Sequence, residues 1–456
     1  MNITEIIANP RKYNLNAPSL GRANIDSPIK GQSFVDENIR ISLATELAQI
    51  ETLKTEVIPS LEKAGPRRKI FFDPAQTRVA IVTCGGLCPG LNNVIKGLVE
   101  VLTYDYGVRM IFGILYGYRG LNPRYGLTAM RLTPDSVDDI HEYGGTMLGS
   151  SRGEQDTKVM VDTLSMQLNV NILFCIGGDG TLRGAHDIVR EITKRNCHIS
   201  VICIPKTIDN DLNLIDRTFG FETCVQSAAE IIKSAHIEAN GISNGLGLVK
   251  VMGRDSGFIA AYASLASSVT NFCIIPEIPL VLEGPNGLFK ALERRYRKKN
   301  HAVMVVAEGA GQDLFNVEAA TDASGNVLKH DIGTLLFDKI NEHFKKDGKE
   351  INIKYIDPSY IIRSIPANSS DAIFCFQLAE NAVHAAMAGK TEIVIGSFKG
   401  VFALVPLEYV VSERKKIDTS SALWHAVKGS TRQNDYFSNT SFETELPNRY
   451  AAEDWG

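Results

Sequence analysis

The sequence predicts an α/β protein with two lobes, each built on a parallel-rich sheet covered by helices, together with an N-terminal arm and a C-terminal tail. From Arg78 onward, short Val/Ile-rich runs alternate with longer amphipathic stretches. This alternation is typical of a parallel sheet that is buried on both faces. The same pattern resumes after Asp211, whereas both ends of the chain are polar. Two lobes with polar extensions are therefore expected.

The elements are expected in the following order. Residues 1–77 are polar, are interrupted by Pro and Gly, and contain one helical stretch within 37–53; they predict an arm that packs on a neighbouring subunit. Residues 78–210 predict the first lobe, with strands at RVAIVT, MIFGIL, ILFCIG and SVICIP. Residues 211–410 predict the second lobe, with room for the chain to cross between lobes. Residues 411–456 predict a surface tail.

The composition is that of a globular protein and excludes several classes. The 456 residues carry a net charge of −4, which gives no overall attraction to nucleic acid or to an anionic membrane. The basic run 294–299 is interpreted as a solvated helix end. No window approaches the roughly 18 apolar residues of a membrane span, and the N-terminus has no signal-peptide pattern. Eight cysteines, several within apolar runs, suggest buried free thiols in the cytoplasm.

Three loops that follow predicted strands carry the candidate chemistry, because ligands of open α/β sheets bind at the carboxyl ends of the strands. The first loop is Gly85–Asn92, with the sequence GGLCPGLN. Its glycines let the backbone approach a ligand, and the helix that follows favours an anion. The loop matches neither GxxxxGK[ST] nor GxGxxG. Phosphate binding and an ordinary βα turn both remain open at this position.

The second and third loops contain acidic residues. Gly177–Thr181 reads GGDGT, in which an aspartate between glycines can hold Mg²⁺ beside phosphate oxygens. A tight turn capped by Thr181 is the structural alternative. Pro205–Asp211 reads PKTIDND, and its polar residues can orient a hydroxyl group and accept its proton during phosphoryl transfer. Turn chemistry explains one of these acidic residues better than all of them.

GGDGT, PKTIDND and MGRDSGF, which begins at Met252, together resemble the phosphofructokinase family. The stretches VTCGGLCPGLN, YGGTMLGSSRG, RTFGFET, AEGAGQDL and YIDPSYIIR extend the resemblance over about residues 78–406. GGDGT alone would also fit NAD kinases or lipid kinases, but those families do not explain the other motifs. The chain is most similar to the long-chain subgroup of plants and trypanosomes.

The resemblance implies two Rossmann-like lobes and transfer of a phosphoryl group to the 1-hydroxyl of fructose 6-phosphate in glycolysis. It also implies a polyphosphate donor and Mg²⁺ as the cofactor, held by Asp179. The residues implied to bind ATP are Gly86, Arg152, Gly153, Gly178, Asp179, Gly180 and Thr181.

The resemblance further implies that Asp209 is the catalytic base, that Thr207 and Asp211 lie beside it, and that Arg254 contacts the transferring phosphoryl group. Arg363 is implied to grip the 6-phosphate, a task that suits its planar fork. In the family, the position of Lys354 often carries an arginine supplied by a neighbouring subunit. The residues implied to bind the sugar phosphate are Thr207, Ile208, Asp209, Met252, Gly253, Arg254, Glu308, Lys354, Tyr360 and Arg363.

Two positions bear on the choice of donor, and they disagree. Gly180 is the ATP-type residue, since pyrophosphate enzymes typically carry Asp there, whereas Lys206 is typical of pyrophosphate enzymes. We favour ATP, because a nucleotide needs a small residue at 180 while a flexible lysine can move aside. A pyrophosphate-dependent enzyme remains the alternative, followed by a catalytically silent regulatory subunit.

The resemblance also predicts a homotetrameric, cytoplasmic, allosteric enzyme, although this chain departs from the family in two respects. The short bacterial enzymes have an arginine where this sequence has Gly245, so part of the inter-subunit phosphate clamp is absent or replaced. Their effector site also has no obvious counterpart, which leaves the effectors open.

Overall fold

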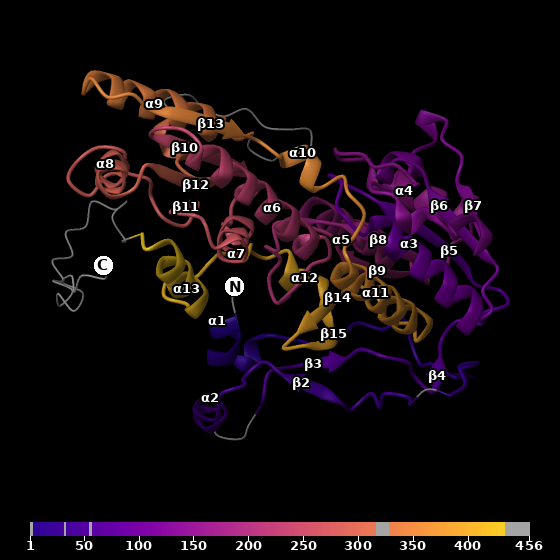
Figure 1. The fold of residues 1–456 in the computed structure, drawn as a ribbon. Helices are drawn as coiled ribbons and strands as arrows, with labels where there is room; N and C mark the ends of the chain where they lie inside the picture. Colours follow the sequence, from indigo (N-terminus) through magenta and orange to yellow (C-terminus); the bar gives the residue numbers. More distant parts are fainter. Residues whose placement is uncertain (1–2, 32, 54–56, 316–327, 434–456) are drawn as a thin grey trace.

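A computed structural model describes residues 3–31, 33–53, 57–315 and 328–433. Its larger sheet has nine strands in the order β2-β3-β15-β14-β9-β8-β5-β6-β7 (Figure 1). The central strands β14, β9, β8, β5 and β6 run parallel, which confirms the sequence prediction. The strands are β2 (Arg40–Ser42), β3 (Ser60–Lys63), β5 (Arg78–Thr83), β6 (Met110–Ile114), β7 (Met130–Leu132), β8 (Ile172–Gly177), β9 (Ser200–Pro205), β14 (Ile393–Phe398) and β15 (Val401–Pro406).

Helices cover both faces of this sheet. Val79 and Ile81 of β5 pack with α3 (Leu91–Glu100) and α11 (Ser369–Met387). The alternate residues of β5 face the opposite cluster, which contains α4 (Thr157–Asp162) and α5 (Asp179–Lys194). Because both faces of the central strands are buried, these strands are continuously apolar.

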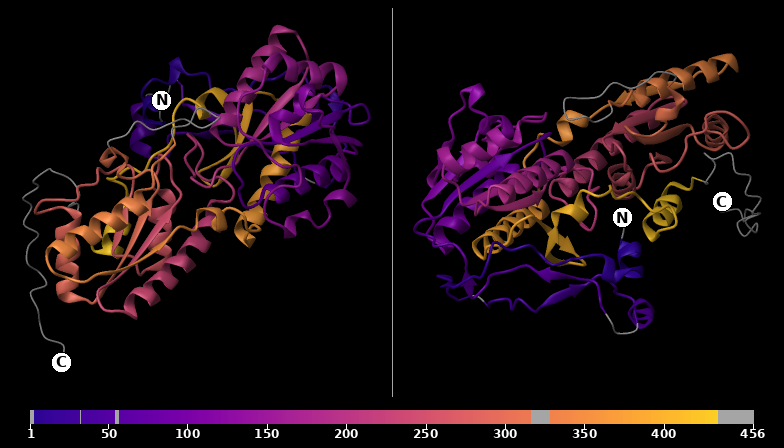
Figure 2. Two further views of the ribbon diagram at one scale, coloured as in Figure 1. Left: turned by 90° about the horizontal axis from the view of Figure 1, so that it is seen from above. Right: turned by 180° about the vertical axis from the view of Figure 1, so that it is seen from behind.

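The second lobe has a parallel sheet of four strands in the order β11-β12-β10-β13. One face packs on α6 and α7 and the other on α8 and α9, and Figure 2 shows this lobe beside the larger one. The strands are β10 (Gly245–Val251), β11 (Phe272–Ile274), β12 (His301–Ala307) and β13 (Asn352–Ile356). The helices are α6 (Phe221–Asn240), α7 (Phe258–Ser267), α8 (Leu288–Lys298), α9 (Ile332–Lys346) and the short α10 (Ser359–Ile362).

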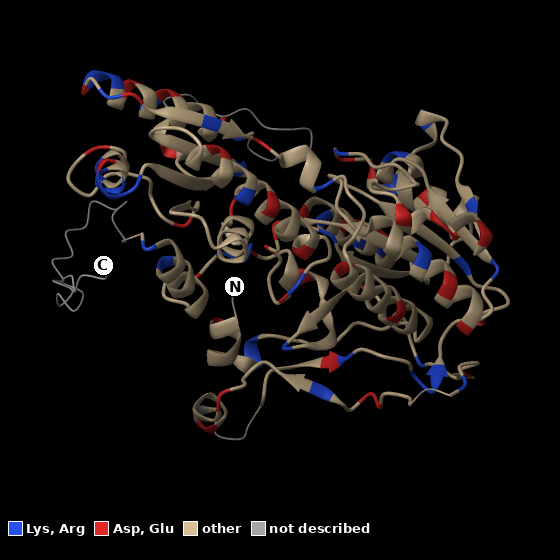
Figure 3. Ribbon diagram, viewed as in Figure 1, with Lys and Arg blue, Asp and Glu red and all other residues tan. Residues whose placement is uncertain are grey.

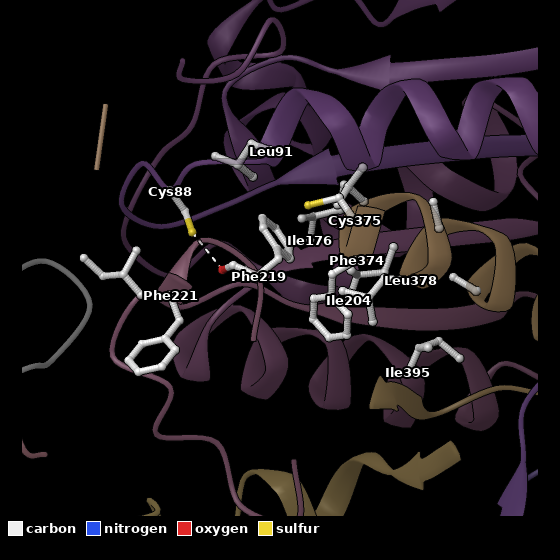
Figure 4. Packing of buried hydrophobic residues seen from close by; sticks show 14 of the residues in the cluster. Cys88, Leu91, Ile176, Ile204, Phe219, Phe221, Phe374, Cys375, Leu378 and Ile395 are labelled. Atoms are coloured by element: carbon white, nitrogen blue, oxygen red, sulfur yellow. Dashed lines mark hydrogen bonds between the residues drawn. The ribbon is translucent and has the colours of Figure 1, made fainter. Parts of the chain in front are cut away.

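One hydrophobic cluster continues from the first lobe into the second (Figure 4). Near the start of α3, the thiol of Cys88 donates a hydrogen bond to the carbonyl of Phe219, 3.1 Å away. Gly90 has a φ of 95°, and a Cβ there would lie 2.6 Å from Sγ of Cys375 on α11. The first candidate loop is therefore held against the chain segment that enters α6.

The structure corrects the predicted boundaries of the lobes. Residues 369–406 were expected in the second lobe, but α11 packs on α3 and β14 pairs with β9 in the first sheet. At the other end, β3 pairs with β15 of the same chain. Strands β2 and β3 therefore join the first sheet, so part of the expected N-terminal arm belongs to the first lobe. β3 pairs antiparallel with β15, and β2 pairs antiparallel with β3. Antiparallel strands need no crossover helix between them, so the sequence gives no helical signal for this pairing.

The expected surface tail is also partly wrong. After β15 the chain forms α12 (Leu407–Val410), and α13 (Ala422–Thr431) then packs on α7. Trp424 of α13 is only 1% exposed, so this helix belongs to the core. Residues 434–456 lie outside the described residues.

The remaining elements are short and lie mainly in the N-terminal region and in the loops. They are α1 (Ile3–Ala8), α2 (Leu47–Thr52), β1 (Ile25–Asp26), β4 (Lys69–Ile70), π-helical turns at Val101–Asp105 and Thr163–Gln167, and 3-10 turns at Pro10–Lys12, Gly117–Leu121, Pro123–Tyr125, Asp135–Val137, Ile140–Glu142 and Gln312–Leu314.

The structure agrees with what the composition predicts about charge, the basic run and the cysteines. Both signs of charge are spread over the two lobes (Figure 3), and the basic run falls in the last turn of α8 as predicted. All eight cysteines are free, and all except Cys197 are buried. Within the described ranges, every helix is too short or too polar to span a bilayer.

Replacing Trp424 tests whether α13 is part of the core. We expect Trp424→Ala to lower the free energy of unfolding by about 3–5 kcal/mol, because it empties a large buried site. His425→Ala, at an exposed neighbouring position, should change it by less than about 0.5 kcal/mol. Denaturant unfolding measures both values, and equal stability of the two variants would contradict the assignment.

Candidate active site

A cavity of about 370 Å³ lies where the two lobes meet. It is lined by loops that follow the carboxyl ends of β5, β8, β9, β10 and β12, where ligands of parallel sheets bind. The predicted site residues that the structure brings together there are Gly86, Arg152, Gly153, Gly178, Asp179, Gly180, Thr181, Lys206, Thr207, Ile208, Asp209, Asp211, Met252, Arg254, Glu308 and Arg363. Their individual roles stay predictions.

The GGDGT loop turns directly from β8 into α5. Gly177 has no room for a side chain, because a Cβ there would lie 2.1 Å from Oγ1 of Thr181. Helix α5 begins at Asp179 and runs for 16 residues, so its N-terminal amide groups lie at the cavity and favour an anion. Gly180 is different, since a Cβ there would meet no atom within 4 Å. Open space beside this residue is available to a ligand.

Three cationic side chains converge on the first loop. Lys206 donates a hydrogen bond from Nζ to the carbonyl of Gly86, 2.7 Å away. A Cβ on Gly86 would lie 3.3 Å from Nη2 of Arg152 and 3.5 Å from Nη1 of Arg363. Burial lowers the pKa of Lys206, and the nearby arginines Arg152 and Arg363 lower it further. This concentration of positive charge suits phosphate groups.

Hydrogen bonds fix the shape of the PKTIDND loop. Oγ1 of Thr207 accepts a bond from the backbone N–H of Asp209, 3.1 Å away, and donates to Oδ1 of Asp211 at 3.3 Å. Asn210 adopts a left-handed φ of 51°, and its Oδ1 accepts from the backbone N–H of Thr218 at 3.0 Å. Because Asn tolerates this conformation, Asp209 and Asp211 can lie on either side of it and both line the cavity.

The carboxyl group of Asp209 lies in an unusual environment. Burial, together with the carboxylates of Asp211 and Glu308, raises the pKa of Asp209 to about 8, against the opposing effect of Arg254. Its Oδ1 is buried and has no hydrogen-bond partner among the residues that the structure describes. Burial also raises the pKa of Asp211 and of Glu308. A carboxyl group in a cavity, with a raised pKa and one buried oxygen that has no partner among the described residues, is typical of a functional site.

Two carboxylates that line the cavity, those of Asp179 and Asp211, could hold a divalent cation. Asp179 and Asp211 offer hard oxygen ligands on the same cavity, and the pKa of Asp211 is raised by burial and by the nearby charge of Asp179. A cation would offset this repulsion. The side chain of Asp179 is partly exposed at the cavity, so its carboxylate could hold such a cation.

Sequence reasoning missed two arginines beside Asp179. Arg183 donates from Nε to Oδ1 of Asp179 at 3.1 Å; its spacing of four residues on a helix could have revealed it. Arg414 donates from Nη2 to Oδ2 of Asp179 at 3.2 Å and lies 3.8 Å from Oδ2 of Asp211. No local pattern predicts Arg414, since it lies 235 residues from Asp179 in the sequence.

Three predicted residues of the second lobe do not line the cavity: Gly253, Lys354 and Tyr360. Tyr360 is 74% exposed, and its ring lies 4.7 Å from the guanidinium carbon of Arg363. Lys354 is also exposed. At Gly245, a Cβ would lie 2.0 Å from the carbonyl oxygen of Ala239, so this backbone has no space for the arginine of the short bacterial enzymes.

Comparison with known proteins gives the family. The family model described as phosphofructokinase matches residues 78–386. A protein of Borreliella burgdorferi named ATP-dependent 6-phosphofructokinase is 48% identical over 91% of this chain and 96% of its own. A Trypanosoma cruzi protein with the same name is 46% identical over 83% of this chain and 78% of its own.

The solved structures agree at the level of the fold. A structure named pyrophosphate-dependent phosphofructokinase from Marinobacter aquaeolei has a TM-score of 0.65 and 17% identity, covering 78% of this chain and 91% of its own. The family match covers both lobes, and the sequence identity extends over most of the chain. The chain therefore belongs to the phosphofructokinase family.

Proposed function

We propose that this protein is an ATP-dependent 6-phosphofructokinase of glycolysis. It transfers the terminal phosphoryl group of ATP to the 1-hydroxyl of D-fructose 6-phosphate and releases fructose 1,6-bisphosphate and ADP. The observation that carries this proposal is that one cavity joins the phosphate-binding loops of the first lobe to Asp209 and Arg254. The names of relatives that are 44–48% identical support the same activity.

Asp209 acts as the general base. Its carboxylate accepts the proton of the 1-hydroxyl as the sugar oxygen attacks the terminal phosphorus and the bond from that phosphorus to the ADP oxygen breaks. A pKa raised to about 8 makes Asp209 a stronger base than an ordinary aspartate. Thr207 supports this role, because its hydroxyl fixes both the backbone of Asp209 and the carboxylate of Asp211.

Positive charge stabilises the transferring group. Arg254 lines the cavity together with Asp209 and Glu308, and its charge opposes the raised pKa of both. We expect it to contact the phosphoryl oxygens. When bound at Asp179, Mg²⁺ offsets charge on the donor phosphates. Glu308 and Met252 line the sugar side of the cavity, and we expect Arg363, which also lines it, to grip the 6-phosphate.

Gly180 supports ATP as the donor, because the space around it can admit a nucleotide. Lys206 favours pyrophosphate as the alternative, since its Nζ lies among the phosphate-binding cations. We give Gly180 more weight, because Nζ of Lys206 is held by the carbonyl of Gly86 and can contact a phosphate of either donor. A silent regulatory subunit is the weakest candidate, since it has no need for the intact acidic loop.

Assembly, location and regulation follow from the family resemblance alone. We propose a cytoplasmic homotetramer that responds to allosteric effectors. In such an assembly, the exposed Lys354 can complete the sugar-phosphate site of a neighbouring subunit.

Removing the base tests the central assignment. We expect Asp209→Ser to lower kcat by about 10²–10⁴-fold, because proton transfer is lost, while fructose 6-phosphate binding changes little. Steady-state kinetics and calorimetric titration measure the two effects, and a thermal unfolding curve is the control for folding. Turnover near that of the unmodified enzyme would rule out Asp209 as the base.

The raised pKa of Asp209 predicts a pH dependence. Since the base must be ionised, kcat/KM for fructose 6-phosphate should fall as the pH drops below about 8 and level off above it. A kcat/KM that stays constant between about pH 6 and about pH 9 would disagree with this prediction.

A negative charge at position 180 tests the choice of donor. Gly180→Asp should fold normally, because the position has open space, but the carboxylate should repel the nucleotide phosphates. We expect kcat/KM for ATP to fall on the order of a hundredfold. Gly429→Asp, at an open position on α13, is the matched control. If both variants use ATP equally well, Gly180 does not determine the donor.

A further inference from the structure

Arg414 lies among carboxylates of both lobes. Its Nη2 donates to Oδ2 of Asp179 at 3.2 Å, and its Nη1 lies 3.8 Å from Oδ2 of Asp211 and pairs with the carboxylate of Asp255. Asp179 and Asp211 belong to the phosphate loop and the catalytic loop of the first lobe, and Asp255 follows Arg254 of the second lobe. One guanidinium group therefore joins the proposed metal ligand to the catalytic loop and to the opposite lobe.

Arg414 reaches this position because the chain crosses between the lobes here. We call residues 411–421, which connect α12 to α13, the crossover segment (Figure 1). Its Lys415 donates a backbone hydrogen bond to the carbonyl of Asp211 at 2.7 Å. Its Ile417 donates one to Oε1 of Glu277 at 2.8 Å, and the same oxygen accepts from the backbone N–H of Gly257. The segment is thus attached to the catalytic loop and to the second lobe.

We propose that Arg414 is an internal counter-ion of the metal site. Without metal, its guanidinium occupies the position between Asp179 and Asp211, and it gives up Asp179 when the divalent cation binds. This proposal rests on the proposed function, because it takes Asp179 as the metal ligand. It adds that metal loading breaks a contact between the first lobe and the crossover segment.

Charge and geometry support competition rather than coexistence. The guanidinium already contacts a carboxylate oxygen of Asp179 and faces one of Asp211, and these are the hard oxygens that a divalent cation prefers. Two cations that share these oxygens repel each other, and the partly buried site screens this repulsion poorly. After it releases Asp179, Arg414 still pairs with Asp255, so its positive charge remains neutralised by a carboxylate.

Binding of Mn²⁺ alone, measured by electron paramagnetic resonance, tests this proposal without a turnover assay. We expect Arg414→Gln to bind Mn²⁺ at least about tenfold more tightly than the unmodified protein, because a nearby positive charge is removed. Lys329→Gln is the matched control: Lys329 pairs with Asp255 at 3.1 Å, and we expect a change of less than about twofold for this variant. Arg414→Lys keeps the positive charge but lacks the planar fork of the guanidinium, so it should fall between the unmodified protein and Arg414→Gln.

The possible outcomes separate this proposal from the proposed function. If Asp179→Asn abolishes Mn²⁺ binding while both Arg414 variants bind Mn²⁺ as the unmodified protein does, the metal site stands and the counter-ion role is overturned. Weaker binding by the Arg414 variants also overturns it, since Arg414 would then organise the carboxylates for the metal. If Asp179→Asn binds Mn²⁺ normally, both the metal assignment and this proposal fail. Thermal unfolding curves without metal verify that each variant is folded, and Arg414→Lys preserves the test if Arg414→Gln does not fold.

Discussion

The whole site depends on holding several carboxylates close together where the two lobes meet. Burial raises the pKa of Asp209, Asp211 and Glu308, so each needs a nearby cation to remain ionised at low cost. Arg254 supplies this charge to Asp209, and Arg414 supplies it to Asp211. The proposed mechanism depends on the same crowding of negative charge, because a poorly stabilised carboxylate is a good base and a site rich in negative charge favours a metal-bound donor.

The packing of the lobes makes this arrangement possible. Cys88, Phe219 and Cys375 bring the first phosphate loop, the entry to α6 and the start of α11 into one hydrophobic cluster. The loops that hold Asp179 and Asp209 follow neighbouring parallel strands of one sheet, β8 and β9. Glu308 follows a strand of the other sheet and meets them only because the shared core aligns the two sheets.

The sequence predicted what depends on local pattern. Buried parallel strands are continuously apolar, and their carboxyl ends converge, so the loops around Gly86, Asp179 and Asp209 could be expected in one site. It could not predict features that depend on distant pairing. The antiparallel strand β15 returns to the first sheet beside β3, and Arg414 is a single arginine in a polar stretch. Tyr360 belongs to the family motif YIIR, yet its side chain is exposed and lies outside the cavity. A sequence motif does not determine which way the side chains of α10 point.

The most direct test of the account is phosphorylation of fructose 6-phosphate by the purified protein with Mg²⁺, comparing ATP and pyrophosphate side by side. We predict fructose 1,6-bisphosphate with ATP and little or none with pyrophosphate, because Gly180 leaves space for a nucleotide. Turnover with pyrophosphate alone would show that Lys206 determines the donor. Absence of turnover with both donors would contradict the catalytic role of the carboxylates between the lobes.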